Sequence, residues 1–404
     1  MMVILMKYSA VFMAAAALLA SSSAVAVSSS MEQRSLRYSK AGKTSKSFKR
    51  SGSASVDSHS YSYSFSLNNN IDAPVNDDDD EQSENQPYTT TFPHQVIGIT
   101  SKETLDDPTS PQARALHWIM NDDGMSLPTD SPEWVQRYIM ASFYFATGGG
   151  DWEECNAPTA TATDYNYNSQ QSEDIDEEAN EKCTLSATHY NKGKKRVYGT
   201  KPWLSPVSVC EWASTACHDD DADDDSKKGT ISQIEFEDNG LQGTLIDELS
   251  HLYNLQFLLI EKGKLSGNIP SKLGQLPLII LDLDYNQLSG EIPEEMYDAT
   301  TLQQIDLNNN QLTGTISPKI GQLPSLTFFQ IDNNKMEGTV PVEMGGKKKL
   351  AVFTLSNNNF TGKMPSQVCD NIKSNDGQGG RLETLIADCQ EVECSCCTDC
   401  IEPV

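Results

Sequence analysis

The fold of this chain is decided by a repeated stretch whose clearest copy, residues 278–293, reads LIILDLDYNQLSGEIP. The pattern L-x-x-L-x-L-x-x-N-x-L-x-G-x-I-P recurs through residues 231–365. Its first position falls at Ile231, Leu255, Leu278, Leu302, Leu326 and Leu350, at spacings of 24, 23, 24, 24 and 24 residues. These six units indicate a solenoid, because one unit of this size cannot bury its own apolar face.

Three apolar columns of the repeat predict a sheet. Positions one, four and six, for example Leu278, Leu281 and Leu283, point inward from a short strand and its approach. Copies of this strand stack at about 4.8 Å and build a parallel sheet along one face. The thirteenth position is glycine in every unit, which supports a turn after the strand.

A polar column runs inside the repeat at the ninth position. It is asparagine at Asn239, Asn286, Asn310, Asn334 and Asn358, and Gly263 interrupts it once. The asparagine amide can donate to and accept from backbone groups. We therefore expect these residues to form a structural ladder that satisfies polar groups of neighbouring turns.

This unit resembles the plant-type extracellular leucine-rich repeat of polygalacturonase-inhibiting proteins and receptor-kinase ectodomains. The preceding residues Trp203-Leu204 and CEWASTAC at 210–217 are similar to that family's N-terminal cap, although Ser214 replaces its glycine. For the whole chain, secreted algal leucine-rich repeat proteins are the nearest resemblance. The resemblance implies a right-handed α/β solenoid, a horseshoe of about six 24-residue units with a parallel concave sheet, a helical cysteine-stapled N-terminal cap and a cysteine-rich C-terminal cap.

Composition divides the rest of the chain. Residues 1–26 read as a secretory signal peptide, with Lys7, an apolar run too short to span a membrane and an A-x-A site ending at Ala26. Residues 27–110 are rich in Ser, Lys and Asp and poor in apolar residues, so we expect them to be disordered. Residues 111–228 are interpreted as the helical cap domain with an acidic insertion, residues 229–365 as the repeats and residues 366–404 as the C-terminal cap.

Two helices are predicted in the N-terminal cap. Residues 111–120 are amphipathic. The second helix follows Ser131-Pro132-Glu133, which supplies a cap, a first-turn proline and an acidic residue at its start. It ends near Thr147. We thus expect the repeats to begin against a small helical unit.

The cysteines form two even groups, as disulfide pairing in an exported chain requires. They are Cys155, Cys183, Cys210 and Cys217 in the first group and Cys369, Cys389, Cys394, Cys396, Cys397 and Cys400 in the second. A bridge from Cys155 to Cys183 would close the acidic insertion, and one from Cys210 to Cys217 would staple the cap. The second group allows fifteen pairings, follows a degenerate seventh strand before Cys389, and is favoured as a disulfide cap over a zinc or redox site.

The charge balance excludes some functions. With 57 acidic and 30 basic residues the chain carries a net charge of −27 and would repel nucleic acid. Its six histidines are scattered and accompany no nucleophile motif, so we expect neither catalysis nor a cofactor. The acidic run at 219–225 lacks the alternating ligands of a calcium loop, and no metal site is predicted.

The outward face of the predicted sheet is the candidate binding surface. Positions five and seven alternate with the core positions and point to the concave side, where we expect them to face solvent. With three aromatic anchors, the candidate ligand-binding residues are Glu235, Glu237, Phe257, Glu261, Asp282, Asp284, Tyr285, Asp306, Asn308, Phe328, Gln330 and Asp332. Their acidity favours a basic partner.

The sequence therefore predicts a secreted recognition module that binds a protein, peptide or glycan on its acidic concave face. A structural or adhesive protein of the extracellular matrix or cell wall is one alternative, and an inhibitor of a secreted glycan-degrading enzyme is another. The sequon Asn359-Phe360-Thr361 makes a glycan on Asn359 plausible in an exported chain.

Overall fold

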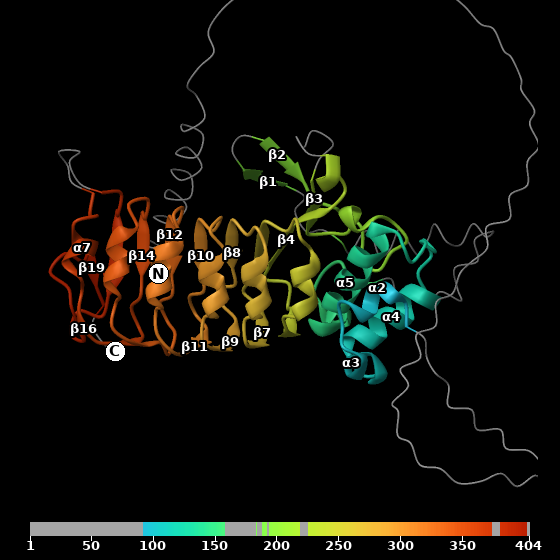
Figure 1. Ribbon diagram of the computed structural model, residues 1–404, viewed down its shortest axis with the longest axis horizontal. Helices are drawn as coiled ribbons and strands as arrows, with labels where there is room; N and C mark the ends of the chain where they lie inside the picture. The colour runs from blue at the N-terminus through green and yellow to red at the C-terminus, as the bar shows by residue number, and fades with distance from the viewer. Residues whose placement is uncertain are drawn as a thin grey trace, which may run out of the picture. The chain divides into compact units, whose positions relative to one another are not determined.

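The computed structural model describes residues 92–157, 183, 188–191, 194–218, 225–373 and 380–401. The predicted signal peptide, residues 27–91 and most of the acidic insertion lie outside these ranges. Within the described ranges the repeats stack as expected (Figure 1).

A nine-stranded sheet runs along one side of the solenoid. Its strands, in spatial order, are β19 (Asp399–Cys400), β17 (Thr384–Ala387), β14 (Val352–Thr354), β12 (Phe328–Gln330), β10 (Gln304–Asp306), β8 (Ile280–Asp282), β6 (Phe257–Glu261), β4 (Ile231–Glu237) and β3 (Thr215–Cys217). Every pair is parallel except β3 with β4. Strand β17 is the predicted degenerate seventh strand.

The apolar columns fill the interior. Leu278, Leu281 and Leu283 are almost completely buried, and the matching residues of the other five units are buried with them. Burial of a leucine or isoleucine side chain stabilises by about 1.5–3 kcal/mol, so these columns supply the main driving force of the solenoid. The predicted solenoid with a parallel sheet is confirmed.

The opposite side of each turn carries shorter elements. They are the strands β5 (Gln242–Thr244), β7 (Lys264–Gly267), β9 (Gln287–Gly290), β11 (Gln311–Leu312), β13 (Glu337–Gly338), β15 (Asn359–Phe360), β16 (Gly362–Lys363) and β18 (Val392–Glu393). The helical turns are η4 (Asp247–His251), η5 (Ser271–Gln275), η6 (Glu294–Asp298), η7 (Pro318–Gln322), η8 (Val342–Gly346) and α7 (Ser366–Cys369). Four of these six turns follow a proline with extended backbone.

Two columns of left-handed backbone turn each unit. The thirteenth-position glycines have φ between 75° and 88°, as their predicted turn requires. The eighth position is also left-handed, with φ between 49° and 56° at Asp238, Lys262, Tyr285, Asn309, Asn333 and Asn357. Asparagine tolerates this region better than most residues, which explains its choice in three units.

The asparagine ladder joins successive units. Asn310 Nδ2 donates to the carbonyls of Leu283 in the preceding unit and Leu307 in its own, at 2.9 and 3.2 Å. Its Oδ1 accepts from the amide of Leu288 at 2.9 Å. Asn334 and Asn358 repeat this arrangement one and two units further along. Each side chain thus satisfies backbone groups in two units.

Both ends of the ladder meet groups from the caps. Asn239 exchanges two hydrogen bonds with the backbone of Glu154, at 2.7 and 3.2 Å. At the other end, Asp388 Oδ1 and Oδ2 accept from the amides of Asn357 and Asn358. The caps therefore replace the missing neighbouring units at the level of single hydrogen bonds.

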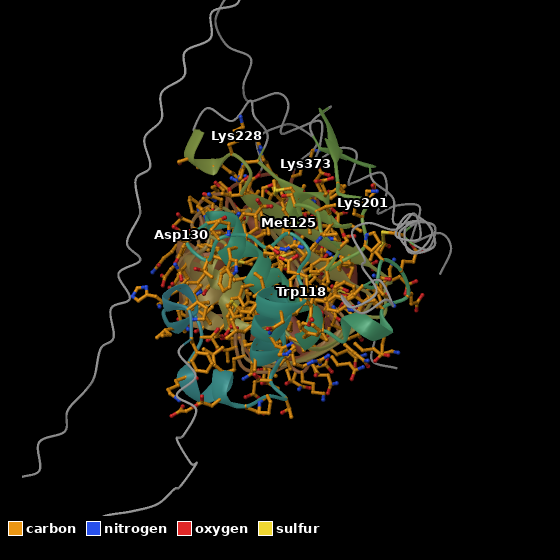
Figure 2. The ribbon with its side chains drawn as sticks, turned by 90° about the vertical axis from the view of Figure 1, so that its right-hand side faces the viewer. Trp118, Met125, Asp130, Lys201, Lys228 and Lys373 are labelled. Carbon is orange, nitrogen blue, oxygen red and sulfur yellow. A yellow bond between two sulfur atoms is a disulfide. The ribbon has the colours of Figure 1, made fainter. Side chains whose placement is uncertain are left out.

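The N-terminal cap is helical, as predicted. Helix α4 (Pro111–Asn121) begins after Ser110, and α5 (Pro132–Ala146) begins after Ser131, whose hydroxyl accepts from Trp134 N. Short 3₁₀ turns η1 (Gly149–Asp151), η2 (Val209–Glu211) and η3 (Asp225–Lys227) and the hairpin β1 (Thr188–Asn191) with β2 (Lys194–Val197) complete this region. Figure 2 looks onto this end of the solenoid, where Trp118 lies near the centre.

The cap has an aromatic core that continues into the repeats. Trp203 lies 5.0 Å from Trp152, 5.3 Å from Trp212 and 5.7 Å from Phe236 between ring centroids. Phe236 belongs to the first repeat strand. One apolar cluster therefore spans the cap and the repeats.

The expectation that residues 27–110 are disordered is wrong for residues 92–110. These form α2 (His94–Ile97) and α3 (Lys102–Asp106), with Val96 and Leu105 buried. Thr100 Oγ1 donates to Glu248 Oε1 at 2.9 Å and so ties this segment to the first repeat turn. A few well-placed apolar residues at the end of a polar stretch are hidden when composition is averaged over the whole stretch.

All ten cysteines are paired. Cys155 is joined to Cys183 and Cys210 to Cys217, the two pairs that the sequence suggested. In the C-terminal cap the pairs are Cys369 with Cys396, Cys389 with Cys400 and Cys394 with Cys397. This is one of the fifteen possible pairings of the six C-terminal cysteines. Because all six form disulfides, none is a thiolate that could bind zinc.

Peptide mapping of the secreted protein under non-reducing conditions tests the C-terminal pairing. We expect fragments joined through the three pairs given above, together with the two N-terminal pairs. Reduced C-terminal cysteines with bound zinc would contradict this cap.

The ladder yields a stability prediction. Replacing Asn310 by alanine leaves the buried amide of Leu288 without an acceptor and removes the donated bonds. We expect the free energy of unfolding, measured by urea titration, to fall by about 2 kcal/mol. Asn268→Ala, at an exposed position outside the ladder, is the control and should change it by less than about 0.5 kcal/mol. Equal losses in both variants would refute a special role for the ladder.

Candidate functional site

The outer face of the parallel sheet carries its side chains in three rows. Position three contributes Gln233, Phe257, Ile280, Gln304, Phe328 and Val352, and position five contributes Glu235, Leu259, Asp282, Asp306, Gln330 and Thr354, each residue paired in register with the next. Position seven adds Glu237, Glu261, Asp284, Asn308, Asp332 and Ser356. Most residues predicted to bind a ligand lie in these rows, and Tyr285 follows immediately after one.

Seven carboxyl groups on these rows define what we call the acidic face. They are Glu235, Glu237, Glu261, Asp282, Asp284, Asp306 and Asp332. Because neighbouring strands are about 4.8 Å apart, side chains of one row stand directly beside each other. The face therefore concentrates like charges along and across the strands.

The acidic face is much less exposed than we expected. Asp282 and Asp306 retain only 5% and 6% of their exposure, and Asn308 retains 7%. The expectation that positions five and seven face solvent freely is wrong for these three residues. The alternation of residues along a strand predicts the side of the sheet to which a side chain points. Its solvent exposure depends on the side chains of the neighbouring rows.

Amide and hydroxyl groups hold several of these carboxylates. Gln304 Nε2 donates to Asp282 Oδ2 at 3.0 Å, and the Gln330 amide donates to Asp306 Oδ2. The Asn308 side chain and backbone donate to Asp306 Oδ1. The hydroxyl of Thr354 donates to Asp332. Neutral donors thus orient the acids without balancing their charge.

The first unit is contacted by the cap. Tyr198 is buried and its hydroxyl donates to Glu235 Oε2 at 2.5 Å, while Gln233 Nε2 donates to the same hydroxyl at 2.5 Å. Lys262 forms an ion pair with Glu237. The glutamines at position three were not among the site residues predicted from the sequence, although their column on the same face of the sheet could have indicated them. Tyr198 belongs to the cap, so no repeat position indicated it.

The three predicted aromatic anchors differ in accessibility. Tyr285 is 52% exposed at its left-handed turn position. Phe328 is partly buried. Phe257 is only 5% exposed and therefore packs within the face rather than offering a surface to a partner.

Burial and mutual repulsion raise the pKa values of these acids. Burial first, and neighbouring carboxylates next, hold the pKa of Asp282 and of Asp306 well above the usual range. Burial raises the pKa of Asp284 to about 6, although Lys262 opposes the change. Burial, with the charges of Asp284, Glu237 and Glu235, raises the pKa of Glu261 to about 8. A positive group on this face would relieve the repulsion.

The raised pKa of Glu261 predicts a dependence of stability on pH. Between its ordinary value of 4.5 and about 8, the unfolded chain loses the proton that the folded protein keeps. The free energy of unfolding should therefore fall as pH rises through this window, by at most about 1.4 kcal/mol per pH unit for this group.

The variant Glu261→Gln should make this decline less steep in urea titrations at pH 5, 6, 7 and 8 with a chelator present. Asp284 contributes its own part below about pH 6, so some decline persists. The control is Glu295→Gln, an exposed residue on the other side of the turn, which should keep the wild-type slope. An unchanged slope in Glu261→Gln would contradict the assignment.

None of the helices that the structure describes between residues 92 and 401 has the length and hydrophobicity that a membrane span requires.

Comparison with known proteins supports the repeat assignment. The Leucine Rich Repeat family model matches residues 277–298 and 301–323. The leucine-rich repeat receptor protein kinase MSL1 of Oryza sativa subsp. japonica is 36% identical over 79 residues, 19% of this chain and 6% of that protein. The receptor-like serine/threonine-protein kinase RGI4 of Arabidopsis thaliana is 39% identical over 95 residues, 23% of this chain and 8% of that protein. The matched part therefore spans less than a tenth of either kinase.

Two solved structures also align with part of the chain. A Pollen Receptor Kinase 3 crystal structure aligns with a TM-score of 0.40 and 28% identity over 48% of this chain and 86% of that one. The BIR3–SERK2 complex from Arabidopsis thaliana aligns with a TM-score of 0.34 and 28% identity over 39% of this chain and 81% of that one. By its repeats and its family match, the solenoid is a plant-type leucine-rich repeat domain similar to those of receptor-kinase ectodomains.

Proposed function

We propose that this leucine-rich repeat protein is an extracellular recognition module whose acidic face binds a cationic segment of a protein or peptide. The observation that carries the proposal is the gathering of seven carboxyl groups on one side of five adjacent strands. Such a surface is costly for the isolated chain and becomes favourable when lysine or arginine side chains neutralise it.

The partial burial of these acids strengthens the argument. Carboxylates near low-dielectric surroundings attract a positive charge more strongly than fully hydrated ones do. Donors such as Gln304 and Asn308 already fix their orientation, so little side-chain freedom is lost on binding. An exposed aromatic ring at Tyr285 adds a contact for an apolar or cationic side chain.

A peptide in the polyproline II conformation that crosses the strands fits the spacing of the rows. Three residues make one turn of this helix, which spans about 9.3 Å and brings the side chain back to the same side, and two strand spacings span about 9.6 Å. A peptide with a basic residue at every third position would therefore place one positive charge over every second strand. This geometry defines a probe for the face.

Location outside the cell is supported by the disulfides. Five disulfides, three of them within residues 369–400, suit an oxidising compartment. Asn359 is exposed, so its sequon is open to glycosylation. The signal peptide and the glycan stay predictions, to be checked on the secreted protein by N-terminal sequencing and mass analysis.

The proposal is tested with a synthetic peptide that carries arginine at every third position and with a scrambled peptide of the same composition. Binding is measured by calorimetry at low and high salt. We expect the periodic peptide to bind more tightly than the scrambled one, and high salt to weaken it because the charges are screened within about 10 Å at 0.1 M.

Two matched variants locate the binding. Glu237→Gln with Asp332→Asn removes two charges from the acidic face and should weaken the periodic peptide about tenfold. Glu295→Gln with Glu343→Gln removes two exposed charges from the opposite side of the turns and should leave the affinity nearly unchanged. Equal weakening in both would show attraction to the net charge alone, and no preference for the periodic peptide would reject this mode of binding.

A further inference from the structure

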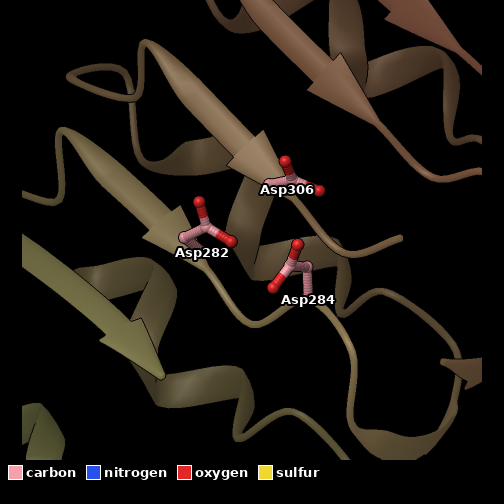
Figure 3. A group of neighbouring side chains, drawn as sticks. All are labelled: Asp282, Asp284 and Asp306. Atoms are coloured by element: carbon pink, nitrogen blue, oxygen red, sulfur yellow. The ribbon is translucent and has the colours of Figure 1, made fainter. Parts of the chain in front are cut away.

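Three aspartates on the acidic face converge on one point. Asp282 ends β8, Asp284 follows two residues later, and Asp306 ends the neighbouring strand β10. One carboxylate oxygen from each lies within 4.8 Å of the others. Figure 3 shows Asp282 and Asp306 at the ends of two neighbouring strands, with Asp284 close to both.

Two of these carboxylates carry a buried oxygen without any hydrogen-bond donor. They are Asp282 Oδ1 and Asp284 Oδ1, and the Asp282 side chain is more than nine-tenths buried. Buried polar atoms are almost always satisfied, because an unpaired one forfeits the hydrogen bonds it made with water. Both unsatisfied oxygens belong to the converging group, which indicates that a positive ligand completes it.

We propose that Asp282, Asp284 and Asp306 bind one calcium ion. All three offer hard carboxylate oxygens, which calcium prefers. Oxygens that lie within 4.8 Å of one another can reach one ion at calcium–oxygen distances of about 2.3–2.6 Å. Magnesium demands near-ideal octahedral geometry and gives up its water reluctantly, whereas calcium accepts irregular sets of carboxylate oxygens, so calcium suits this group better.

The surroundings are built as metal-binding carboxylates usually are. Asp282 Oδ2, the other oxygen of that carboxylate, accepts a hydrogen bond from Gln304. Asp306 accepts hydrogen bonds from Asn308 and Gln330. Such outer hydrogen bonds orient ligands and keep them in place before the ion arrives. Three protein oxygens leave further calcium positions to water, since calcium takes six to eight ligands.

This site would join the third and fourth repeat units through an ion. It goes beyond the proposed recognition of a cationic partner and does not depend on it. Glu237 and Asp332, which test the partner, lie outside the three ligands, so failure of either idea can be told from failure of the other.

The test uses the full secreted chain, freed of metal with a chelator, and titrates it with calcium chloride alone in a calorimeter. We expect one equivalent of calcium to bind, with a dissociation constant of about 10⁻³ M or tighter, as in extracellular calcium modules. Calcium at ten times its dissociation constant should raise the unfolding temperature of the protein by about 3 °C or more. Absence of binding would overturn the proposal.

A pair of isosteric variants separates a built site from diffuse attraction. Asp284→Asn removes one ligand charge and should weaken calcium binding at least about tenfold, whereas Glu237→Gln removes one charge from the same face and should weaken it less than about threefold. Equal weakening would overturn the site.

The Asp284→Asn variant also has a signature without metal. It removes one of three repelling carboxylates, so its unfolding temperature in chelator should be equal to or above that of the wild type, while calcium should no longer raise it. A wild-type increase with calcium in this variant would also reject the assignment. Circular dichroism is measured on both variants to check that they are folded.

Discussion

The parallel stacking of one strand per unit is the constraint on which the rest of this structure depends. It sets every repeat position beside its own copies at about 4.8 Å, so whatever chemistry a position has is multiplied into a row. Leucine rows become a continuous core, and asparagine rows become a ladder of shared hydrogen bonds. Aspartate and glutamate rows become a surface of crowded negative charge.

Stacking lowers the free energy of the asparagine row and raises that of the acidic row, and the chain contains both. Asn310 and Asn334 each satisfy groups in two units, so stacking stabilises them. Asp282 and Asp306 are buried beside neighbours of their own sign, and burial first and these neighbours next raise their pKa values. A row of buried acidic side chains of this kind is stabilised by a positive charge, which the backbone and the side-chain amides of the repeats do not supply.

Much of this could be predicted from sequence because it depends on periodicity. The apolar columns, the ladder, the glycine turns and the Ser131 cap each follow from a local rule that tertiary contacts do not override. The burial of Asp282 could not be predicted, because it depends on the side chains of adjacent rows rather than on its own strand. The pairing of Cys369 with Cys396 depends on the path of the closing loops, and the folding of residues 92–110 depends on a contact with Glu248 far along the chain.

The two ends of the ladder bear on how such a chain can change in length. Asn310, Asn334 and Asn358 reach back to Leu283, Leu307 and Ile331 through the same spacing of 27 residues. A unit copied between them would find the partners its parent had. Asn239 and Asp388 instead bond to Glu154 and Asn358, which belong to junctions that occur once. Duplication or deletion of a repeat unit is therefore expected to be tolerated in the middle of this solenoid and to be disruptive at its junctions with the caps.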